Sequence, residues 1–220
     1  MIIKDFQLKK TINENHKFLN ILIFGPNEGL VKEQIEIITK KILEKGEYEQ
    51  INFNGKDLDN NPQSLDEIIR TVSMFHENKI VIAENIKDKH LDILNNIASD
   101  EPEQTILIIR DGNLNKSSKI RKFYENEKNS FSLACYEDDG RSIIKNIDDF
   151  IRKNNFELNR DVKTYLLQSL SNDRMVSKRE LEKIEIFYGK SKAKIELEDI
   201  KKLLNDSSSQ NLNKMNENVL

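Results

Sequence analysis

The sequence is poor in the residues and runs that mark secreted, disulfide-bonded and membrane proteins. Its 220 residues include one cysteine, three prolines and seven glycines. Because a single thiol, Cys135, cannot form an internal disulfide, the sequence favours a reducing compartment. No apolar run approaches the ~20 residues that a membrane helix needs, and residues 1–6 do not have a signal-peptide pattern. We therefore expect a cytoplasmic protein that has no membrane partner.

Neither sign of charge dominates the chain. It has 35 Lys and Arg residues against 38 Asp and Glu residues, which gives a net charge of −3. The overall charge therefore does not indicate nucleic-acid binding, which would need a local basic patch. A charged fraction of 33% beside a hydrophobic fraction of 37% is typical of a soluble globular protein.

The patterns of metal sites and catalytic nucleophiles are also missing. The three histidines, His16, His76 and His90, lie far apart and do not have the spacing of a zinc site. Cys135 ends an apolar stretch, where a buried inert thiol is expected. No serine lies in a glycine elbow. We predict no catalytic residue, no metal and no cofactor.

What is present is a regular alternation of apolar patterns up to about residue 136. Short β-branched runs predict strands at residues 21–24, 48–53, 80–83, 105–109 and 131–135. Helical periodicity predicts helices between them, at residues 31–45, 64–72, 89–98 and 117–124. Strands that alternate with helices argue for a parallel sheet covered on both faces. We therefore predict an α/β fold with a five-stranded parallel sheet.

The pattern changes near Asp138, because every later periodic segment is helical. The expected helices cover residues 141–154, 160–170, 177–188 and 197–204. We predict an α/β domain over residues 1–138 and a small all-helical domain over residues 139–206. Residues 207–220 are predicted to be a polar linker and the start of a further domain.

The loop after the first predicted strand has the shape of a phosphate site but lacks its chemistry. A P-loop needs glycines, a Lys that reaches the phosphates, and a Ser or Thr for magnesium. Gly25 and Gly29 are present, but Leu30 and Val31 stand where the Lys and the hydroxyl would be. Asn27 is placed to cap the following helix. Anion binding through backbone amides remains an alternative, but we prefer a simple turn and predict no ATP hydrolysis.

Several stretches, in their order and spacing, resemble one family within the AAA+ class, whose plan is an α/β domain followed by a helical lid. They are residues 24–30, 73–75 ahead of 79–82, 114–122, 134–136, 177–184 and 195–200. The chain resembles the delta-subunit family of the bacterial DNA polymerase III clamp loader. The resemblance implies a non-hydrolysing subunit that binds and helps to open the beta sliding clamp. It also implies tau/gamma and delta prime subunits as partners through a third, collar domain, and primed DNA as an indirect partner.

Met74 and Phe75 are two adjacent large apolar residues between a predicted helix and a predicted strand. The polar run from His76 to Lys79 is expected to hold that connection in water. The ordinary interpretation is that both apolar side chains belong to the core. The resemblance implies instead that Met74 and Phe75 bind the clamp.

A basic cluster follows the fourth predicted strand. Lys116, Lys119, Arg121 and Lys122 are a candidate contact for DNA or phosphate, although a solvated helix face is the usual explanation of such a run. Two other functions remain open beside clamp binding. One is a nucleotide hydrolase with a divergent loop, and the other is a scaffold with an AAA+ shape and no clamp role.

Overall fold

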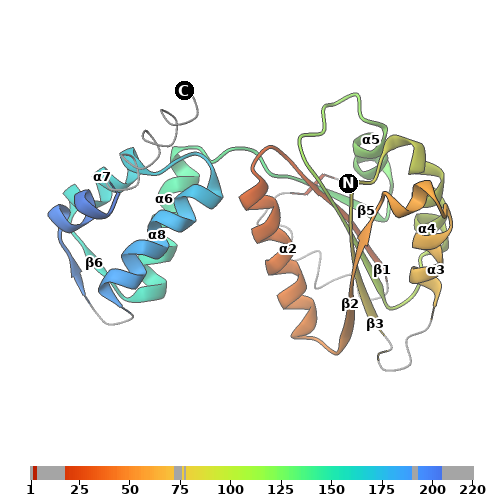
Figure 1. Cartoon of the computed structure of the whole chain (residues 1–220), viewed down its shortest axis with the longest axis horizontal. Coiled ribbons are helices and arrows are strands. Elements are labelled where there is room, and N and C mark those ends of the chain that lie inside the picture. Colours follow the sequence, from red (N-terminus) through yellow and green to blue (C-terminus); the bar gives the residue numbers. More distant parts are fainter. Residues whose placement is uncertain (1, 4–17, 72–75, 77, 190–192, 205–220) are drawn as a thin grey trace, which may run out of the picture. The chain divides into compact units, whose positions relative to one another are not determined.

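The computed structural model describes residues 2–3, 18–71, 76, 78–189 and 193–204. The chain divides into two compact units, Met1–Tyr136 and Glu137–Leu220, which we call unit 1 and unit 2 (Figure 1). Among the described residues, no helix is long and apolar enough to cross a bilayer.

Unit 1 is built on a five-stranded sheet in which all the strands are parallel. Its elements in chain order are β1 (Phe18–Phe24), α2 (Glu28–Leu43), β2 (Tyr48–Asn54), η1 (Asp57–Asp59), α3 (Ser64–Arg70), β3 (Asn78–Glu84), η2 (Asp88–His90), α4 (Leu91–Asp100), β4 (Thr105–Asp111), α5 (Lys119–Asn126) and β5 (Ser130–Ala134). The strand order is β2-β3-β4-β1-β5. The predicted α/β fold with a five-stranded parallel sheet is therefore confirmed.

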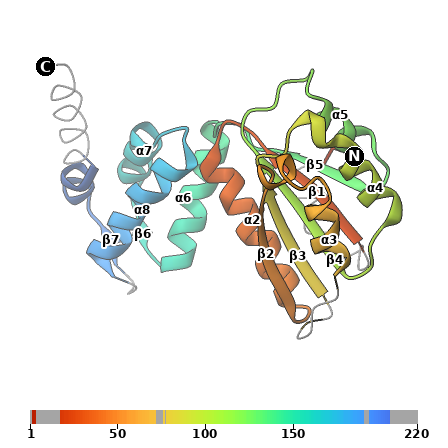
Figure 2. The same ribbon diagram turned by 45° about the vertical axis from the view of Figure 1, so that its right-hand side comes forward.

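Helices cover both faces of this sheet (Figures 1 and 2). Helix α2 packs on one face through Val31, Ile35, Ile38 and Ile42, all of which are buried, as their helical spacing predicts. Helices α3, α4 and α5 supply side chains to the core on the opposite face. Because both faces are covered, the inner strands β1, β3 and β4 carry nearly continuous apolar runs. The edge strands β2 and β5 alternate polar and apolar residues.

Strand β1 lies inside the sheet and is held by a buried polar cluster as well as by apolar packing. Asn20 is fully buried and donates to the Ser130 hydroxyl of β5 at 3.0 Å. The Tyr124 hydroxyl of α5 donates to the Asn20 side-chain oxygen at 2.6 Å. Burial raises the pKa of Tyr124, and the bond to Asn20 opposes that rise. The cluster joins three elements and gives each buried polar group a partner.

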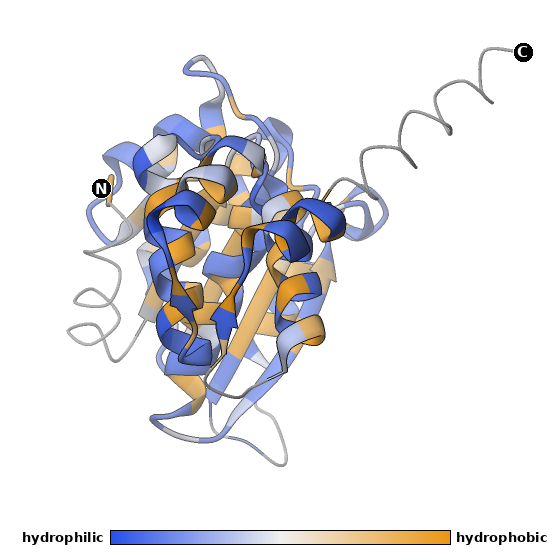
Figure 3. Ribbon diagram, turned by 90° about the vertical axis from the view of Figure 1, so that its left-hand side faces the viewer, coloured by the Kyte–Doolittle hydropathy of each residue, from blue (hydrophilic) through white to orange (hydrophobic). Residues whose placement is uncertain are grey.

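Unit 2 has its own apolar core, formed by α6 (Gly140–Asn154), α7 (Arg160–Ser169), α8 (Arg174–Tyr188) and a helical stretch at residues 197–204. These helices show both polar and apolar stretches along the ribbon (Figure 3). Asp138, ahead of α6, is buried and pairs with Arg174 at the start of α8 at 3.0 Å. Burial raises the pKa of Asp138, and the Arg174 charge opposes the rise.

The prediction that unit 2 is all-helical is wrong in one respect. Two short strands, β6 (Glu157–Leu158) and β7 (Lys194–Ile195), form a parallel pair. The pair lies beside the core, because Phe156 and Ile195 are both buried. Two residues are too few to show the two-residue period of a strand, so the sequence pattern could not reveal this pair.

Candidate functional site

The loop between β1 and α2 lies at the carboxyl end of the sheet, where P-loop proteins bind phosphate. Gly25 has a φ of +152°, and a Cβ atom there would lie 2.0 Å from the carbonyl oxygen of Cys135. Only glycine fits so close an approach. The Gly25 amide donates to the carbonyl oxygen of Gly112 at 2.9 Å. The loop is therefore bound to the residues that follow β4 and β5.

Asn27 uses its backbone and its side chain to close the same loop. Its amide donates to the Cys135 carbonyl oxygen at 3.3 Å, and its side-chain nitrogen donates to the Tyr136 carbonyl oxygen at 3.3 Å. Its side-chain oxygen accepts from the Leu30 amide at 3.1 Å, which is the predicted helix cap. The amides of Gly25, Asn27 and Leu30 are thus already bonded to the protein.

The positions of the missing Lys and Ser or Thr are used for packing. Val31 is buried in the core under α2, and the half-buried Leu30 packs against that core. Gly29 lies in the first turn of α2. A phosphate cradle needs free amides and a cation, whereas this loop offers bonded amides and apolar side chains.

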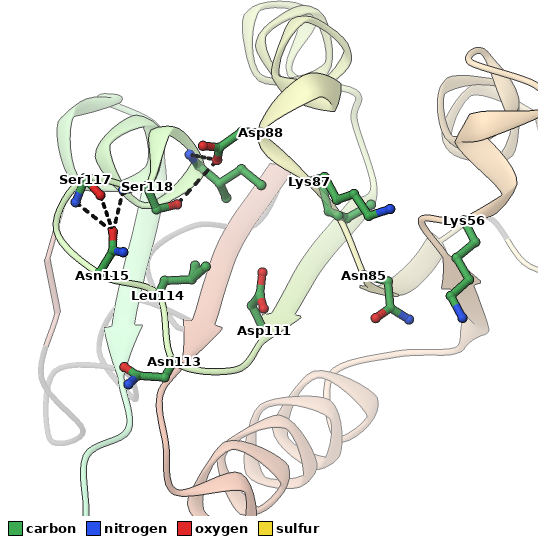
Figure 4. A pocket seen from close by; sticks show the side chains of 12 residues that line it. Lys56, Asn85, Lys87, Asp88, Asp111, Asn113, Leu114, Asn115, Ser117 and Ser118 are labelled. Atoms are coloured by element: carbon green, nitrogen blue, oxygen red, sulfur yellow. Dashed lines mark hydrogen bonds between the residues drawn. The ribbon is translucent and has the colours of Figure 1, made fainter.

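A cavity of about 500 Å³ opens beside the loop, at the carboxyl ends of β2, β3 and β4 (Figure 4). It is lined mainly by polar side chains, which include Lys56, Asn85, Lys87, Asp111, Asn113 and Asn115. Asp111 lies between Leu114 and Asn85 in this view. Burial raises the pKa of Asp111; the hydrogen bond from the Gly112 amide, at 2.7 Å, opposes the rise, and the Asp88 charge adds to it.

One wall of the cavity is the start of α5, and Asp88 occupies it. The Asp88 carboxylate accepts from the amides of Lys119 and Ile120 at 3.2 and 3.1 Å, and from the Ser118 hydroxyl at 3.4 Å. A helix N-terminus attracts anions, but here a carboxylate of the protein fills that place. Asp88 therefore ties η2 to α5.

The predicted basic cluster is divided by the structure. The Arg121 guanidinium pairs with Glu125 at 2.7 Å, donates to the Leu114 carbonyl oxygen at 3.0 Å, and lies 4.9 Å from the centroid of the Phe24 ring. Glu125 raises the pKa of Arg121. Lys116, Lys119 and Lys122 are exposed. The Arg121 side chain is engaged inside unit 1, and only the three lysines face solvent.

Met74 and Phe75, the residues expected to bind the clamp, lie outside the described residues. The structure does describe both flanks of their connection, which joins α3 to the amino end of β3. On the strand side, the Asn78 side chain donates to the Glu47 carbonyl oxygen at 3.3 Å. On the helix side, Arg70 pairs with Asp100 of α4. The connection is therefore attached to the sheet domain at both ends.

The expectation that Lys79 belongs to a solvated turn is wrong. Lys79 is the second residue of β3 and is 6% exposed. Its amide donates to the Gln104 carbonyl oxygen at 2.9 Å, which extends the pairing of β3 with the chain before β4. A two-residue period through Lys79, Val81 and Ala83 was the available signal, because it places all three on the same face of the sheet.

No group of three or more His, Cys, Asp or Glu side chains in the described part of the chain is arranged to hold a metal ion. His90 is buried, and its ring contacts Asp59 at 3.3 Å and the Lys87 amide at 3.2 Å. Lys89 lowers the pKa of Asp59. These contacts account for His90 as a structural residue of η2, and His16 lies outside the described residues.

Comparison with known proteins identifies one family. The family model described as "DNA polymerase III, delta subunit" matches residues 21–135. A curated relative, the probable DNA polymerase III subunit delta of Rickettsia prowazekii (strain Madrid E), is 26% identical over 177 residues. The match covers 78% of this chain and 51% of the relative, so the chain spans about half the length of that protein.

Solved structures with similar folds include three bacterial proteins. The Bacillus subtilis DNA clamp loader delta protein matches with a TM-score of 0.58 at 18% identity, over 90% of this chain and 62% of its own. Domain III of the Thermotoga maritima replication initiation protein DnaA gives 0.54 at 10% identity, over 91% of this chain and 89% of its own. A Thermotoga maritima RuvB mutant matches with a TM-score of 0.55 at 12% identity, over 91% of this chain and 66% of its own. At these identities the likeness concerns the fold alone.

Proposed function

The chain belongs to the DNA polymerase III delta subunit family, and we propose on that basis that it binds the beta sliding clamp and helps to open it. The observation that carries the proposal is the family match over residues 21–135, which spans the connection between α3 and β3. The proposed partners also include the tau/gamma and delta prime subunits, with primed DNA reached indirectly.

The proposed clamp-binding residues are Met74 and Phe75. Phe offers a large rigid apolar surface, and Met adapts to an irregular pocket. Burying both in a partner is worth on the order of 3–6 kcal/mol before the costs of association. Binding favours an open clamp only by the difference in affinity between its open and closed forms.

The proposed subunit does not hydrolyse ATP. The bonded amides of Gly25, Asn27 and Leu30, and the apolar residues in place of the Lys and the hydroxyl, support this part of the proposal. The same contacts count against the alternative of an active nucleotide hydrolase. Family membership counts against the alternative of a scaffold that has no clamp role.

The test is equilibrium binding of the purified chain to the beta clamp. Met74→Ala combined with Phe75→Ala is expected to abolish binding while the melting temperature stays nearly unchanged. The matched control is Ile186→Ala combined with Phe187→Ala, which truncates two adjacent apolar side chains of α8 that are 82% and 58% exposed. The control is expected to bind normally. If the first variant unfolds and each single variant binds like the wild type, the assignment of Met74 and Phe75 is wrong.

A further inference from the structure

Lys79 is buried in an apolar setting that a lysine rarely occupies. It shares a face of β3 with Val81 and Ala83, which belong to the core under α3, α4 and α5. Removing an ammonium group from water is costly unless the group gains a partner. The partner therefore indicates why a lysine stands here.

That partner is the backbone of α3. The Lys79 ammonium group donates to the Ile68 carbonyl oxygen at 2.8 Å. Ile68 lies in the last turn of α3, where carbonyl groups lack partners within the helix and a positive charge is favourable. In the described part of the chain no carboxylate forms an ion pair with Lys79. The side chain thus ties the end of α3 to the start of β3.

Ile69, in the same turn of α3, is buried in the core, but the other polar attachments of α3 near this point are weaker. Arg70 pairs with Asp66 at 2.7 Å and also with Asp100 of α4, but its side chain is 47% exposed. Exposed ion pairs contribute little because water screens them and the long side chains lose entropy. The Thr71 hydroxyl donates to the Glu67 carbonyl oxygen at 2.6 Å within the same helix end. Among the described residues, the Lys79 ammonium group makes a partly buried hydrogen bond that joins the end of α3 to β3.

We propose that Lys79 is a positioning residue for clamp binding, because it fixes the distance and direction between the two flanks of the connection that carries Met74 and Phe75. The inference rests on the proposed function. A partner binds more tightly when less conformational freedom is lost on association. If the flanks separate, a smaller fraction of molecules is competent to bind, and the apparent Kd rises by the inverse of that fraction.

The test compares Lys79→Met with Lys79→Arg in the whole chain. Methionine keeps much of the apolar stem but cannot donate, so the Kd for the beta clamp is expected to rise roughly tenfold. Arginine still donates and is expected to recover part of the affinity. Without clamp, hydrogen exchange of the amides of Ile69, Arg70 and Thr71 is expected to be faster in Lys79→Met only.

Two controls separate positioning from a general loss of stability. Ile38→Val, in the core on the other face of the sheet, lowers the melting temperature without touching α3 and is expected to leave the Kd unchanged. In a double-mutant cycle, Lys79→Met is expected to cost less affinity when Met74→Ala is already present, because misplacing a side chain that is already truncated loses few contacts with the clamp. A purely structural lysine would give additive effects.

The outcomes distinguish this inference from the proposed function. Loss of binding in the Met74→Ala, Phe75→Ala variant together with an unchanged Kd in Lys79→Met overturns the role of Lys79 alone. An equal loss of affinity in Ile38→Val and Lys79→Met also overturns it. If the wild-type chain does not bind the beta clamp, both proposals fall. The role of Lys79 is supported if Lys79→Met raises the Kd for the clamp, Lys79→Arg restores part of the affinity, and the effect of Lys79→Met is smaller in the Met74→Ala background.

Discussion

The two ends of the parallel sheet in unit 1 differ in what their polar groups do. At the carboxyl end, the amides of Gly25 and Asn27 donate to carbonyl groups that follow β4 and β5. At the amino end of β3, the buried Lys79 holds the flank of a connection that we propose to bind another protein. The fold usually places its ligand at the carboxyl end. Here the loop between β1 and α2 is closed by internal bonds, whereas the clamp contact that we propose lies at the opposite end of the sheet.

The most disruptive change at the carboxyl end is expected to be Gly25→Ala. The new Cβ would meet the Cys135 carbonyl oxygen at 2.0 Å, and the φ of +152° is strained for any other residue. We expect a loss of roughly 3 kcal/mol or more of unfolding free energy, measured by denaturant titration. Gly112→Ala is the control, since a Cβ there meets nothing within 4 Å. Equal stability of the two variants would show that the loop is not closed as described.

Asn27→Ala is expected to have the next largest effect. It removes the cap on the Leu30 amide and the bond to the Tyr136 carbonyl oxygen, and losing such a cap costs about 1–2 kcal/mol. The same titration measures it. Asn113→Ala, an exposed amide at the same end of the sheet, is expected to change stability by less than about 0.5 kcal/mol. A loss confined to Asn113→Ala would contradict the assignment of the cap.

Asp111→Asn is expected to stabilise unit 1 slightly at neutral pH. Burial raises the pKa of Asp111 in the folded chain, so the folded state loses stability as pH rises from the unfolded value of 3.8 through the raised value. The neutral Asn side chain does not ionise, so the variant does not lose this stability as the pH rises. The melting temperature of the variant should therefore exceed that of the wild type at pH 7, and the difference should vanish below pH 3.8. If the difference in melting temperature between the variant and the wild type grows as the pH falls, the buried Asp111 carboxylate does not destabilise the folded state.

The smallest expected effect on ligand binding is that of restoring the missing P-loop residues. Leu30→Lys combined with Val31→Thr adds a cation and a hydroxyl, but the amides of Gly25 and Asn27 remain bonded to Gly112 and Cys135. We expect no ATP binding by titration calorimetry in the presence of magnesium. Tight binding by this variant would mean that the carboxyl end lacks only two side chains, and the contrast between the two ends would disappear.

The sequence predicted the parts of this molecule that depend on local pattern. The β-branched runs marked the strands, the spacing from Val31 to Ile42 marked the buried face of α2, and Leu30 and Val31 marked a loop without a phosphate-binding cation. Each of these features is contained within a few turns of chain. The absence of the Lys and of the hydroxyl residue could be recognised from the sequence because the P-loop motif fixes the positions of both.

The features that the sequence could not reveal depend on residues far apart in the chain. Nothing near Gly25 indicates that Cys135 will approach it, and nothing near Lys79 names Ile68 as its partner. The sequence predicted that Lys79 is solvated because it ends a polar run. Its place in the two-residue period of the strand, which indicates a buried position, was the weaker signal. Arg121 looked like part of a basic surface for the same reason, although Glu125 and Phe24 engage it.

The position of β1 between β4 and β5 has a consequence for biosynthesis. β1 is made first among the strands, yet its neighbour Ser130 in β5 follows Asn20 by 110 residues. At about 5–20 residues per second on the ribosome, the apolar run of β1 waits roughly 5–20 s for its last neighbour. During that time Ile21, Leu22, Ile23 and Phe24 have no completed sheet to enter. Exposed apolar segments of this kind are prone to aggregation, and this one is fully paired only after β5 and Cys135 have been synthesised.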